Sequence, residues 1–249
     1  MTLSAPKRNA SVAVVGAGDY IGGEIAKKFA SEGFDVYAGR RGGDKLEGLF
    51  DEIRAAGGSA QGRSLDARVP EDVTAFLQEA EAISPLEVVI FNIGANVNFP
   101  LVDTTDRVFR KVWEMACFAG FVTGREAARI MLPRGKGNIF FTGATAGLRG
   151  GAGYAAFASA KFGLRAVAEA TAREMMPQGL HVAHLVIDAA VDTAWVRNLV
   201  ASKEGAEALE KEGRFMDPAA VAEAYWSLYN QRQDAWTFEM QIRPSGETW

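Results

Sequence analysis

The stretch SVAVVGAGDYIGGEIAKKFA, residues 11–30, decides the fold. It begins with a short apolar, β-branched run that ends in glycine, and helical periodicity then follows through Ile21, Ile25 and Phe29. The stretch therefore predicts a buried strand, a tight glycine turn and a helix over 20–32. This is the unit from which parallel α/β sheets are built.

The same alternation of apolar strand and periodic helix continues along most of the chain. Pro70 suits a first helical turn, and Pro133 and Pro177 end two long helices. Because continuous apolar strands alternate with helices, we expect one doubly wound α/β domain over 1–249, with a parallel sheet covered on both faces. The predicted strands are 11–16, 34–39, 59–66, 86–92, 137–143, 180–187 and 235–244, and the predicted helices are 20–32, 43–56, 70–82, 105–132, 153–176 and 217–231.

The regular alternation of strands and helices ends after residue 188. Residues 193–213 read as an amphipathic, partly exposed helical excursion, and we expect this segment to be a substrate lid over an apolar pocket. Side chains on such a helix equally fit a purely packing role. The candidate lid or pocket residues are Trp195, Leu199, Phe215 and Met216.

Composition excludes several classes of protein. The net charge of −4 gives no basic surface, so we expect no nucleic-acid partner. No apolar run reaches the roughly 18 residues of a membrane helix, and the N-terminus lacks the apolar segment of a secretory signal. The single cysteine, Cys117, excludes an internal disulfide framework. With only two histidines besides, the chain has few ligands for a zinc site. We therefore expect a cytoplasmic, metal-free protein without membrane contact.

The glycine turn is the first motif that carries chemistry. Gly16, Gly18 and Gly22 allow the backbone to approach a pyrophosphate at the N-terminus of the following helix, where free N–H groups favour an anion. Glycine turns also join strands to helices without any ligand. The position in the first strand–helix unit of a doubly wound sheet favours the dinucleotide.

The end of the second strand bears on the choice of dinucleotide. Arg40 and Arg41 stand where a carboxylate would bind the ribose hydroxyls of NAD, and a guanidinium there pairs with the 2′-phosphate of NADP. The alternative is a solvated basic turn. Asp19 complicates the prediction, because a carboxylate in the phosphate loop would repel the same phosphate. We expect NADP(H), with NAD(H) as the alternative.

Several further motifs together resemble the short-chain dehydrogenase/reductase family over nearly the whole chain. They are the glycine loop, LDAR at 65–68, FNIGAN at 91–96, ATAG at 144–147 and Thr193. The resemblance implies a Rossmann fold and an NAD(P)(H)-dependent oxidoreductase that acts on a carbonyl/alcohol pair of a small, apolar substrate. It also implies a homodimer or homotetramer formed through the long helices 105–132 and 153–176.

The same resemblance assigns roles to individual residues. Asp66 would touch the adenine, Asn92 and Gly94 would line the cofactor, and Thr193 would reach the nicotinamide carboxamide. Lys161 would hold the ribose. The full set of expected cofactor-binding residues is Gly16, Gly18, Tyr20, Ile21, Gly22, Arg40, Arg41, Asp66, Asn92, Gly94, Lys161 and Thr193.

The chain departs from the family where catalysis takes place. The active-site quartet of the family is Asn, Ser, Tyr and Lys, and aligning on Lys161 puts Ala116, Ala144 and Phe157 at the first three positions. In the glycine loop, Tyr20 stands at the position where the family has its middle glycine. Loss of a general acid costs about 10²- to 10⁴-fold in rate, so activity requires a substitute group.

Two side chains are candidates for that substitute. Tyr154 precedes Phe157 and Lys161 by three and seven residues, but helical side chains lean toward the N-terminus, so its hydroxyl should point away from Lys161. Packing or substrate contact is the other role open to Tyr154. Asp188 follows the sixth strand and could be a pocket carboxylate, or a turn residue that caps local N–H groups.

Two functions remain open from the sequence. One is an atypical oxidoreductase in which Lys161, Tyr154 and Asp188 are the catalytic candidates. The other is a non-catalytic NADP(H)-binding homologue that acts as a sensor or as the inactive partner in an oligomer. The largely apolar neighbourhood of Lys161 favours cofactor binding under either hypothesis, because a buried ammonium needs oxygen-rich partners.

Overall fold

In a computed structural model, which describes residues 5–247, the chain forms a single α/β domain with a seven-stranded parallel sheet. The strand order is β3-β2-β1-β4-β5-β6-β9, so the chain starts in the middle and winds outward in both directions. The sheet strands are β1 Ser11–Val15, β2 Asp35–Arg40, β3 Ser59–Ser64, β4 Leu86–Phe91, β5 Gly137–Ala144, β6 Leu180–Ile187 and β9 Glu239–Ile242. The doubly wound fold predicted from the sequence is confirmed.

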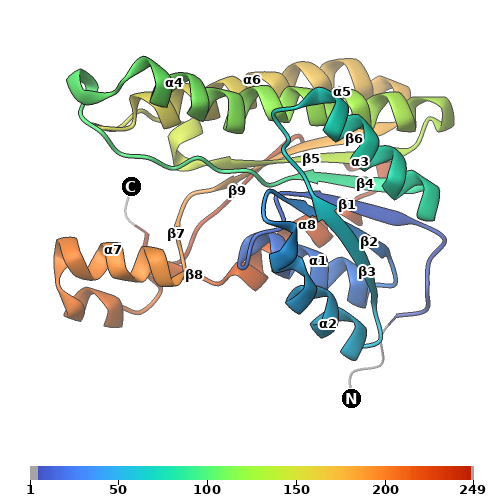
Figure 1. The fold of residues 1–249 in the computed structure, drawn as a ribbon, viewed down its shortest axis with the longest axis horizontal. Helices are drawn as coiled ribbons and strands as arrows, with labels where there is room; N and C mark the ends of the chain where they lie inside the picture. The colour runs from blue at the N-terminus through green and yellow to red at the C-terminus, as the bar shows by residue number, and fades with distance from the viewer. Residues whose placement is uncertain (1–4, 248–249) are drawn as a thin grey trace.

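Helices cover both faces of the sheet (Figure 1). Helices α3, α4, α5 and α6 lie on one face, and α1, α2 and α8 lie on the other. The bounds are α1 Ile21–Ser31, α2 Glu47–Ala55, α3 Pro70–Ile83, α4 Asp106–Trp113, α5 Ala119–Met131, α6 Ala155–Met175, α7 Ala194–Glu204 and α8 Pro218–Tyr229. Helix α7 stands apart from both layers and reaches beyond the sheet beside the short strands β7 Ala190–Val191 and β8 Phe215–Met216.

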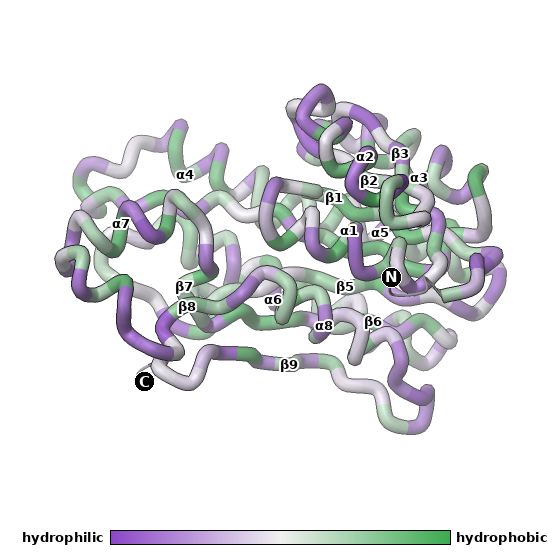
Figure 2. Tube along the Cα trace, turned by 90° about the horizontal axis from the view of Figure 1, so that it is seen from below, coloured by the Kyte–Doolittle hydropathy of each residue, from purple (hydrophilic) through white to green (hydrophobic). Residues whose placement is uncertain are grey.

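Two apolar cores hold the layers together. Alternate residues of β1 belong to different cores. Val12 and Val14 pack toward α1 and α8, whereas Ala13 and Val15 pack toward α3 and α5. Because both faces of each central strand are buried, the strands are apolar throughout rather than alternating. Figure 2 shows the hydrophobic residues along the central strands and the hydrophilic ones on the outer turns of the chain.

Three predicted helices differ from the structure in detail. The one predicted at 43–56 opens as a 3₁₀ helix over Gly43–Leu46 before α2 begins. The one predicted at 105–132 contains a π-helical turn over Glu114–Phe118, which separates α4 from α5. The excursion 193–213 breaks at Gly205, whose φ of 91° is a left-handed conformation that glycine adopts without strain.

Candidate cofactor and substrate cleft

Two cavities lie at the carboxyl ends of the parallel strands, the edge at which sheets of this kind bind ligands. The first, of about 320 Å³, extends along β1, β2 and β3, and the second, of about 550 Å³, extends along β5 and β6. Asn92, Ile93 and Gly94, which follow β4, line both. The two cavities therefore form one continuous cleft across the middle of the sheet.

The glycine loop forms one wall of this cleft. Gly16 has a φ of 98°, and a Cβ on Gly22 would lie 2.4 Å from the carbonyl oxygen of Gly16, so α1 packs directly on the loop backbone. A Cβ on Gly18 would meet no atom within 4 Å. Tyr20 stands at the N-cap of α1 and provides no side-chain cap, which leaves the helix N-terminus open toward an anion.

Tyr20 has a second contact that the sequence did not indicate. Its hydroxyl accepts a hydrogen bond of 3.2 Å from the backbone N–H of Ala194, the first residue of α7. Ile21 lines the second cavity, so the helix start lies between the two cavities. The loop position where the family that the sequence resembles has glycine is thus used here to reach the start of α7.

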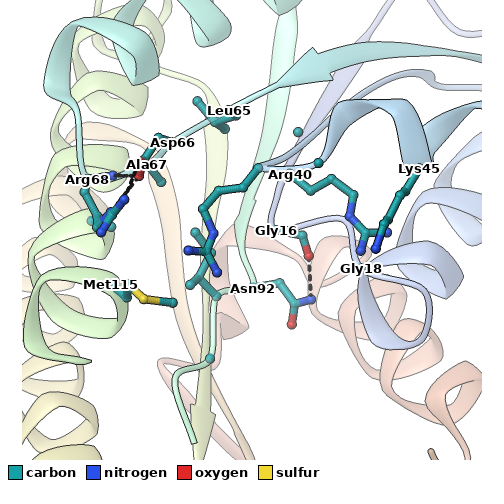
Figure 3. A pocket seen from close by; sticks show the side chains of 16 residues that line it. Gly16, Gly18, Arg40, Lys45, Leu65, Asp66, Ala67, Arg68, Asn92 and Met115 are labelled. Carbon is teal, nitrogen blue, oxygen red and sulfur yellow. Dashed lines mark hydrogen bonds and ion pairs between the residues drawn. The ribbon is translucent and has the colours of Figure 1, made fainter. Parts of the chain in front are cut away.

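Basic residues gather at the outer end of the first cavity. Arg40, Arg41 and Lys45 all line it, and Figure 3 shows Arg40 and Lys45 ending close together beside Gly18. Arg40 also forms an ion pair with Asp19, which is more exposed than the arginine. The carboxylate that was expected to complicate phosphate binding is therefore partly neutralised by the same arginine.

Asp66 lines the first cavity on the opposite side from Arg40 (Figure 3). Its carboxylate accepts from Arg68 Nε at 2.9 Å and from a terminal guanidinium nitrogen at 2.5 Å. These hydrogen bonds from Arg68 lower the pKa of Asp66. The carboxylate is thus held in place, as a residue that lines a binding pocket must be.

Lys161 lies at the floor of the second cavity and is only 3% exposed. Its ammonium donates to the carbonyl oxygens of Thr142, at 2.7 Å, and Ile93, at 3.3 Å. The oxygen-rich partners expected for this lysine are thus provided by two backbone carbonyls of the protein itself. Burial lowers the pKa of Lys161 to about 8, because the charged form loses its hydration.

A chain of polar groups connects Lys161 to the glycine loop. Tyr225 and Thr142 share a hydrogen bond of 2.6 Å, and Thr142 Oγ1 donates to Asn92 Oδ1 at 3.1 Å. Asn92 Nδ2 in turn donates to the carbonyl oxygen of Gly16. Since Thr142 Oγ1 gives its proton to Asn92, the hydroxyl of Tyr225 is the donor in their bond. Thr142 is therefore engaged in structure and not free as a catalytic hydroxyl.

The wall next to Lys161 is apolar. Ala116, Phe157 and Ala160 belong to one buried cluster, against which Ala144 and Tyr154 pack. Ala144, Tyr154 and Phe157 also line the second cavity. Tyr154 is the residue before the first turn of α6. Among the described residues that line this cavity, it is the one tyrosine.

Asp188 lies behind the second cavity and is 1% exposed. One carboxylate oxygen accepts from Thr145 Oγ1 at 2.5 Å and faces Arg149 at 3.4 Å, and the other faces Gln241 and Arg243, both at 2.9 Å. Asp188 therefore forms the centre of a buried polar cluster that links β5, β6 and β9.

The remaining candidates have structural contacts. Thr193 caps α7, its hydroxyl accepting from the N–H of Val196 at 3.1 Å. His184 is fully buried with Nδ1 3.0 Å from Glu239, and Cys117 is buried in the apolar cluster. No group of three or more His, Cys, Asp or Glu residues suited to a metal ion occurs within residues 5–247.

Sequence reasoning missed Lys45, Arg68 and Arg149, which also line the cleft. Arg149 carried a readable signal, because it stands in a glycine-rich loop directly after a predicted strand, and such loops converge at one edge of a parallel sheet. Among the described residues, no helix is both long and apolar enough to cross a membrane.

Comparison with known proteins gives consistent results. A family model described as "short chain dehydrogenase" matches residues 10–204. The 3-oxoacyl-[acyl-carrier-protein] reductase MabA of Mycobacterium avium is 30% identical over 190 residues, which are 76% of this chain and 70% of that protein.

Solved structures resemble the fold over almost its full length. A crystal structure of a short-chain dehydrogenase from Rhodopseudomonas palustris is 64% identical, with a TM-score of 0.83 over 95% of this chain and 99% of that one. A variant of actinorhodin polyketide ketoreductase with NADPH is 23% identical, with a TM-score of 0.87 over 95% and 97% of the two chains.

Proposed function

Because the chain belongs to the short-chain dehydrogenase family of oxidoreductases, we propose that it interconverts a carbonyl and an alcohol with NADP(H). The observation that carries the proposal is Lys161, a buried ammonium held at the junction between the glycine-loop wall and an apolar cavity of about 550 Å³. This cavity continues the part of the cleft that suits a dinucleotide, so it provides room for a small substrate beside a cofactor.

The first cavity fits a dinucleotide with a 2′-phosphate. Gly18 leaves open space at the uncapped start of α1, where a pyrophosphate would lie, and Asp66 and Asn92 stand further along the cleft. Arg40, Arg41 and Lys45 would hold the 2′-phosphate through charge-assisted hydrogen bonds. When bound, the nicotinamide would supply or accept the hydride. The NADPH reported with the actinorhodin ketoreductase variant agrees with this preference.

Protonation of the substrate oxygen falls to the residues around the apolar wall. The pKa of Lys161, about 8, lies close to neutral pH, which is where a general acid works best. The hydroxyl of Tyr154, which also lines this cavity, is the other candidate proton donor. We assign the proton to Lys161, because two backbone carbonyls fix its ammonium in the lining of the cavity.

Asp188 is not available as a general base. Its carboxylate oxygens are occupied by four donors, and Ile187 and Ala189 on either side of it line the cavity instead. We therefore assign it a positioning role. The segment 193–213, which contains α7, would act as the lid, since it begins two residues after Val191, which lines the second cavity.

The central experiment is a titration of the protein with NADPH and NADH by fluorescence, followed by cofactor oxidation over a panel of ketones, aldehydes and quinones. We expect tighter binding of NADPH and slow oxidation with a subset of carbonyls. Rates of carbonyl reduction should fall as the pH rises through about 8, because Lys161 loses its proton there. Tight NADPH binding without any turnover would instead favour the non-catalytic homologue.

A second experiment restores the groups that the family places at the apolar wall. The double variant Phe157→Tyr plus Ala144→Ser would add two hydroxyls to the lining of the second cavity. We expect its rate to exceed that of the parent by about 100-fold, the lower end of what a general acid contributes. An unchanged rate would mean that this wall does not face the reacting oxygen. The variant Tyr154→Phe in the parent background tests the remaining donor.

A further inference from the structure

We propose that Arg149 binds an anionic group of the substrate, a carboxylate or a phosphate ester, in the second cavity. The inference rests on the proposed function and narrows it, since it changes the substrate from a small apolar carbonyl compound to one that is apolar near the carbonyl and acidic at its other end. The observations concern the position of Arg149, its partners and the charge of the cavity.

Arg149 is built into the wall of the cavity. It follows the 3₁₀ turn Thr145–Gly147 at the end of β5, and its backbone N–H donates to the carbonyl oxygen of Thr145 at 3.1 Å. Arg149 lines the cavity together with Gly150 and Gly151, neither of which has a side chain to cover it. Its own side chain is 48% exposed, so the guanidinium is accessible to a ligand.

The carboxylate of the protein does not satisfy this guanidinium. Asp188 faces Arg149 at 3.4 Å, whereas its contacts with Thr145, Gln241 and Arg243 measure 2.5, 2.9 and 2.9 Å. The arginine thus makes the longest of four contacts to a carboxylate already occupied by three closer donors. A guanidinium has five N–H donors, so this one long contact leaves donors of Arg149 available to a ligand.

The charge of the cavity also favours an anion. Among the described residues that line it there is no carboxylate, while Lys161 and Arg149 contribute the two cationic side chains. Two of the three N–H donors of Lys161 are held by backbone carbonyls and the third is assigned to the substrate oxygen, so Arg149 is the cation of the lining that is available to an anionic group. A cleft lined by one sign of charge attracts the opposite charge, and a planar guanidinium binds carboxylates and phosphates through paired hydrogen bonds.

The lining of the cavity combines apolar and basic side chains. Ala144 and Phe157 form an apolar wall next to Lys161, and Arg149 follows Ala144 by five residues on the loop that leads to α6. A substrate with its carbonyl at the apolar wall and its acidic group at Arg149 would be held at both ends. Arg149 is therefore a specificity-determining residue, and it takes no part in the proton transfer.

Matched pairs of ketones test the inference by binding rather than by turnover. The probes are 4-oxooctanoate with its methyl ester, and 5-oxohexyl phosphate with 6-hydroxyhexan-2-one, each titrated by calorimetry into the protein saturated with NADP⁺. We expect at least one anion to bind about 10- to 100-fold more tightly than its neutral partner, the range of a charge-assisted hydrogen-bonded pair. The pair that discriminates shows whether the group is a carboxylate or a phosphate.

Two variants of Arg149 and one matched control complete the test. Arg149→Met should abolish the preference for the anion, and Arg149→Lys should keep a part of it. Arg54→Met is the control, because Arg54 is 50% exposed and pairs with Asp51 on α2, away from the residues that line either cavity. It should leave the preference unchanged, and all three variants should keep the NADPH affinity of the parent.

The outcomes separate this inference from the proposed function. Equal binding of acid and neutral ketone by the parent, or an anion preference that survives in Arg149→Met, would overturn the role of Arg149. If no carbonyl compound supports oxidation of NADPH but the anion preference is intact, the proposed enzyme activity would be overturned and the anion site would stand. Failure of NADPH to bind would count against the proposed function alone, and the titrations would then be repeated without cofactor.

Discussion

Lys161 ties the stability of the protein to pH. Its pKa is about 8 when folded and near 10.5 when unfolded, so between these values the unfolded chain holds a proton that the folded one lacks, and stability rises with pH. Below about pH 8 both states are protonated and the full cost of burial is present.

Compared with Lys161→Met, the parent should therefore gain about 3 kcal/mol of unfolding free energy between about pH 7.5 and 10.5. Urea denaturation without cofactor measures this difference at each pH. Methionine keeps an unbranched side chain, so other titrating groups cancel in the comparison. A difference between the two proteins that does not vary with pH would show that the folded ammonium is not desolvated.

Asp19 and a 2′-phosphate would compete for the same guanidinium, that of Arg40. The variant Asp19→Ala removes both the competitor and a repelling charge, so NADPH should bind about 3- to 10-fold more tightly while NADH affinity stays unchanged. Arg40→Ala should weaken NADPH by about 10-fold. Asp51→Ala, on α2, is the control for a general change in charge. Equal effects on both dinucleotides would contradict the phosphate assignment.

At the scale of elements, the junction of β1 and α1 separates folding from ligand binding. A Cβ on Gly22 would lie 2.4 Å from the oxygen of Gly16 and 2.7 Å from Cα of Ala17, both backbone atoms that cannot turn aside. Gly22→Ala should therefore destabilise the protein by about 2–3 kcal/mol, as overpacking does. Thermal denaturation provides the measurement.

Gly18→Ala is the matched change on the same loop, because its Cβ would meet no atom within 4 Å. We expect its unfolding free energy to stay within about 0.5 kcal/mol of the parent. NADPH affinity should nevertheless fall by about 10-fold, since the methyl group takes space beside the helix N-terminus where phosphate would lie. If affinity is retained, the cofactor does not approach this glycine.

The order and type of the elements could be predicted from the sequence, whereas their interruptions could not. The apolar strands and periodic helices follow from local patterns, which is why the parallel sheet was foreseen. The π-helical turn at Glu114–Phe118 left no such trace, because its residues fit an α-helix equally well and only the hydrogen-bond pattern differs. Strands β7 and β8, of two residues each, are too short to show a period.

The candidate site was predictable to a similar extent. The burial of Lys161 followed from its apolar neighbours, and the glycine loop and Asn92 followed from motifs. The surroundings of Asp188 did not follow from the sequence, since Gln241 in β9 and Arg243 directly after β9 lie more than fifty residues further along the chain. Partners at such separations are set by the topology of the sheet, and local sequence patterns do not record them.

At the scale of the molecule, exposed aromatic side chains occur on each of the three helices α4, α5 and α6. Phe109, Trp113, Phe121 and Phe162 are each 40–43% exposed, and Phe118 links Trp113 and Phe121 with ring centroids 6.3 Å apart on either side. Contiguous apolar surface of this kind is typical of protein–protein interfaces. We propose that a homodimer or homotetramer assembles through this face.

The double variant Trp113→Glu plus Phe121→Glu should lower the mass of the particle to that of a monomer, because two carboxylates would be buried in the interface. Light scattering coupled to size-exclusion chromatography measures that mass. Trp195→Glu, on α7, replaces an even more exposed tryptophan outside this face and should leave the mass unchanged. A parent protein that is already monomeric would overturn the assignment.

The hydrogen bond between Tyr20 and Ala194 joins the glycine loop to the lid segment across the mouth of the cleft. Gly18, on one side of it, lines the first cavity, and Val191, on the other, lines the second. We expect occupancy of the two cavities to be reciprocally linked, because a ligand that orders one of these segments orders the other through this hydrogen bond. A hydrogen bond of this kind contributes about 1 kcal/mol, which sets its share of that cooperativity at roughly fivefold in affinity, equal in both directions.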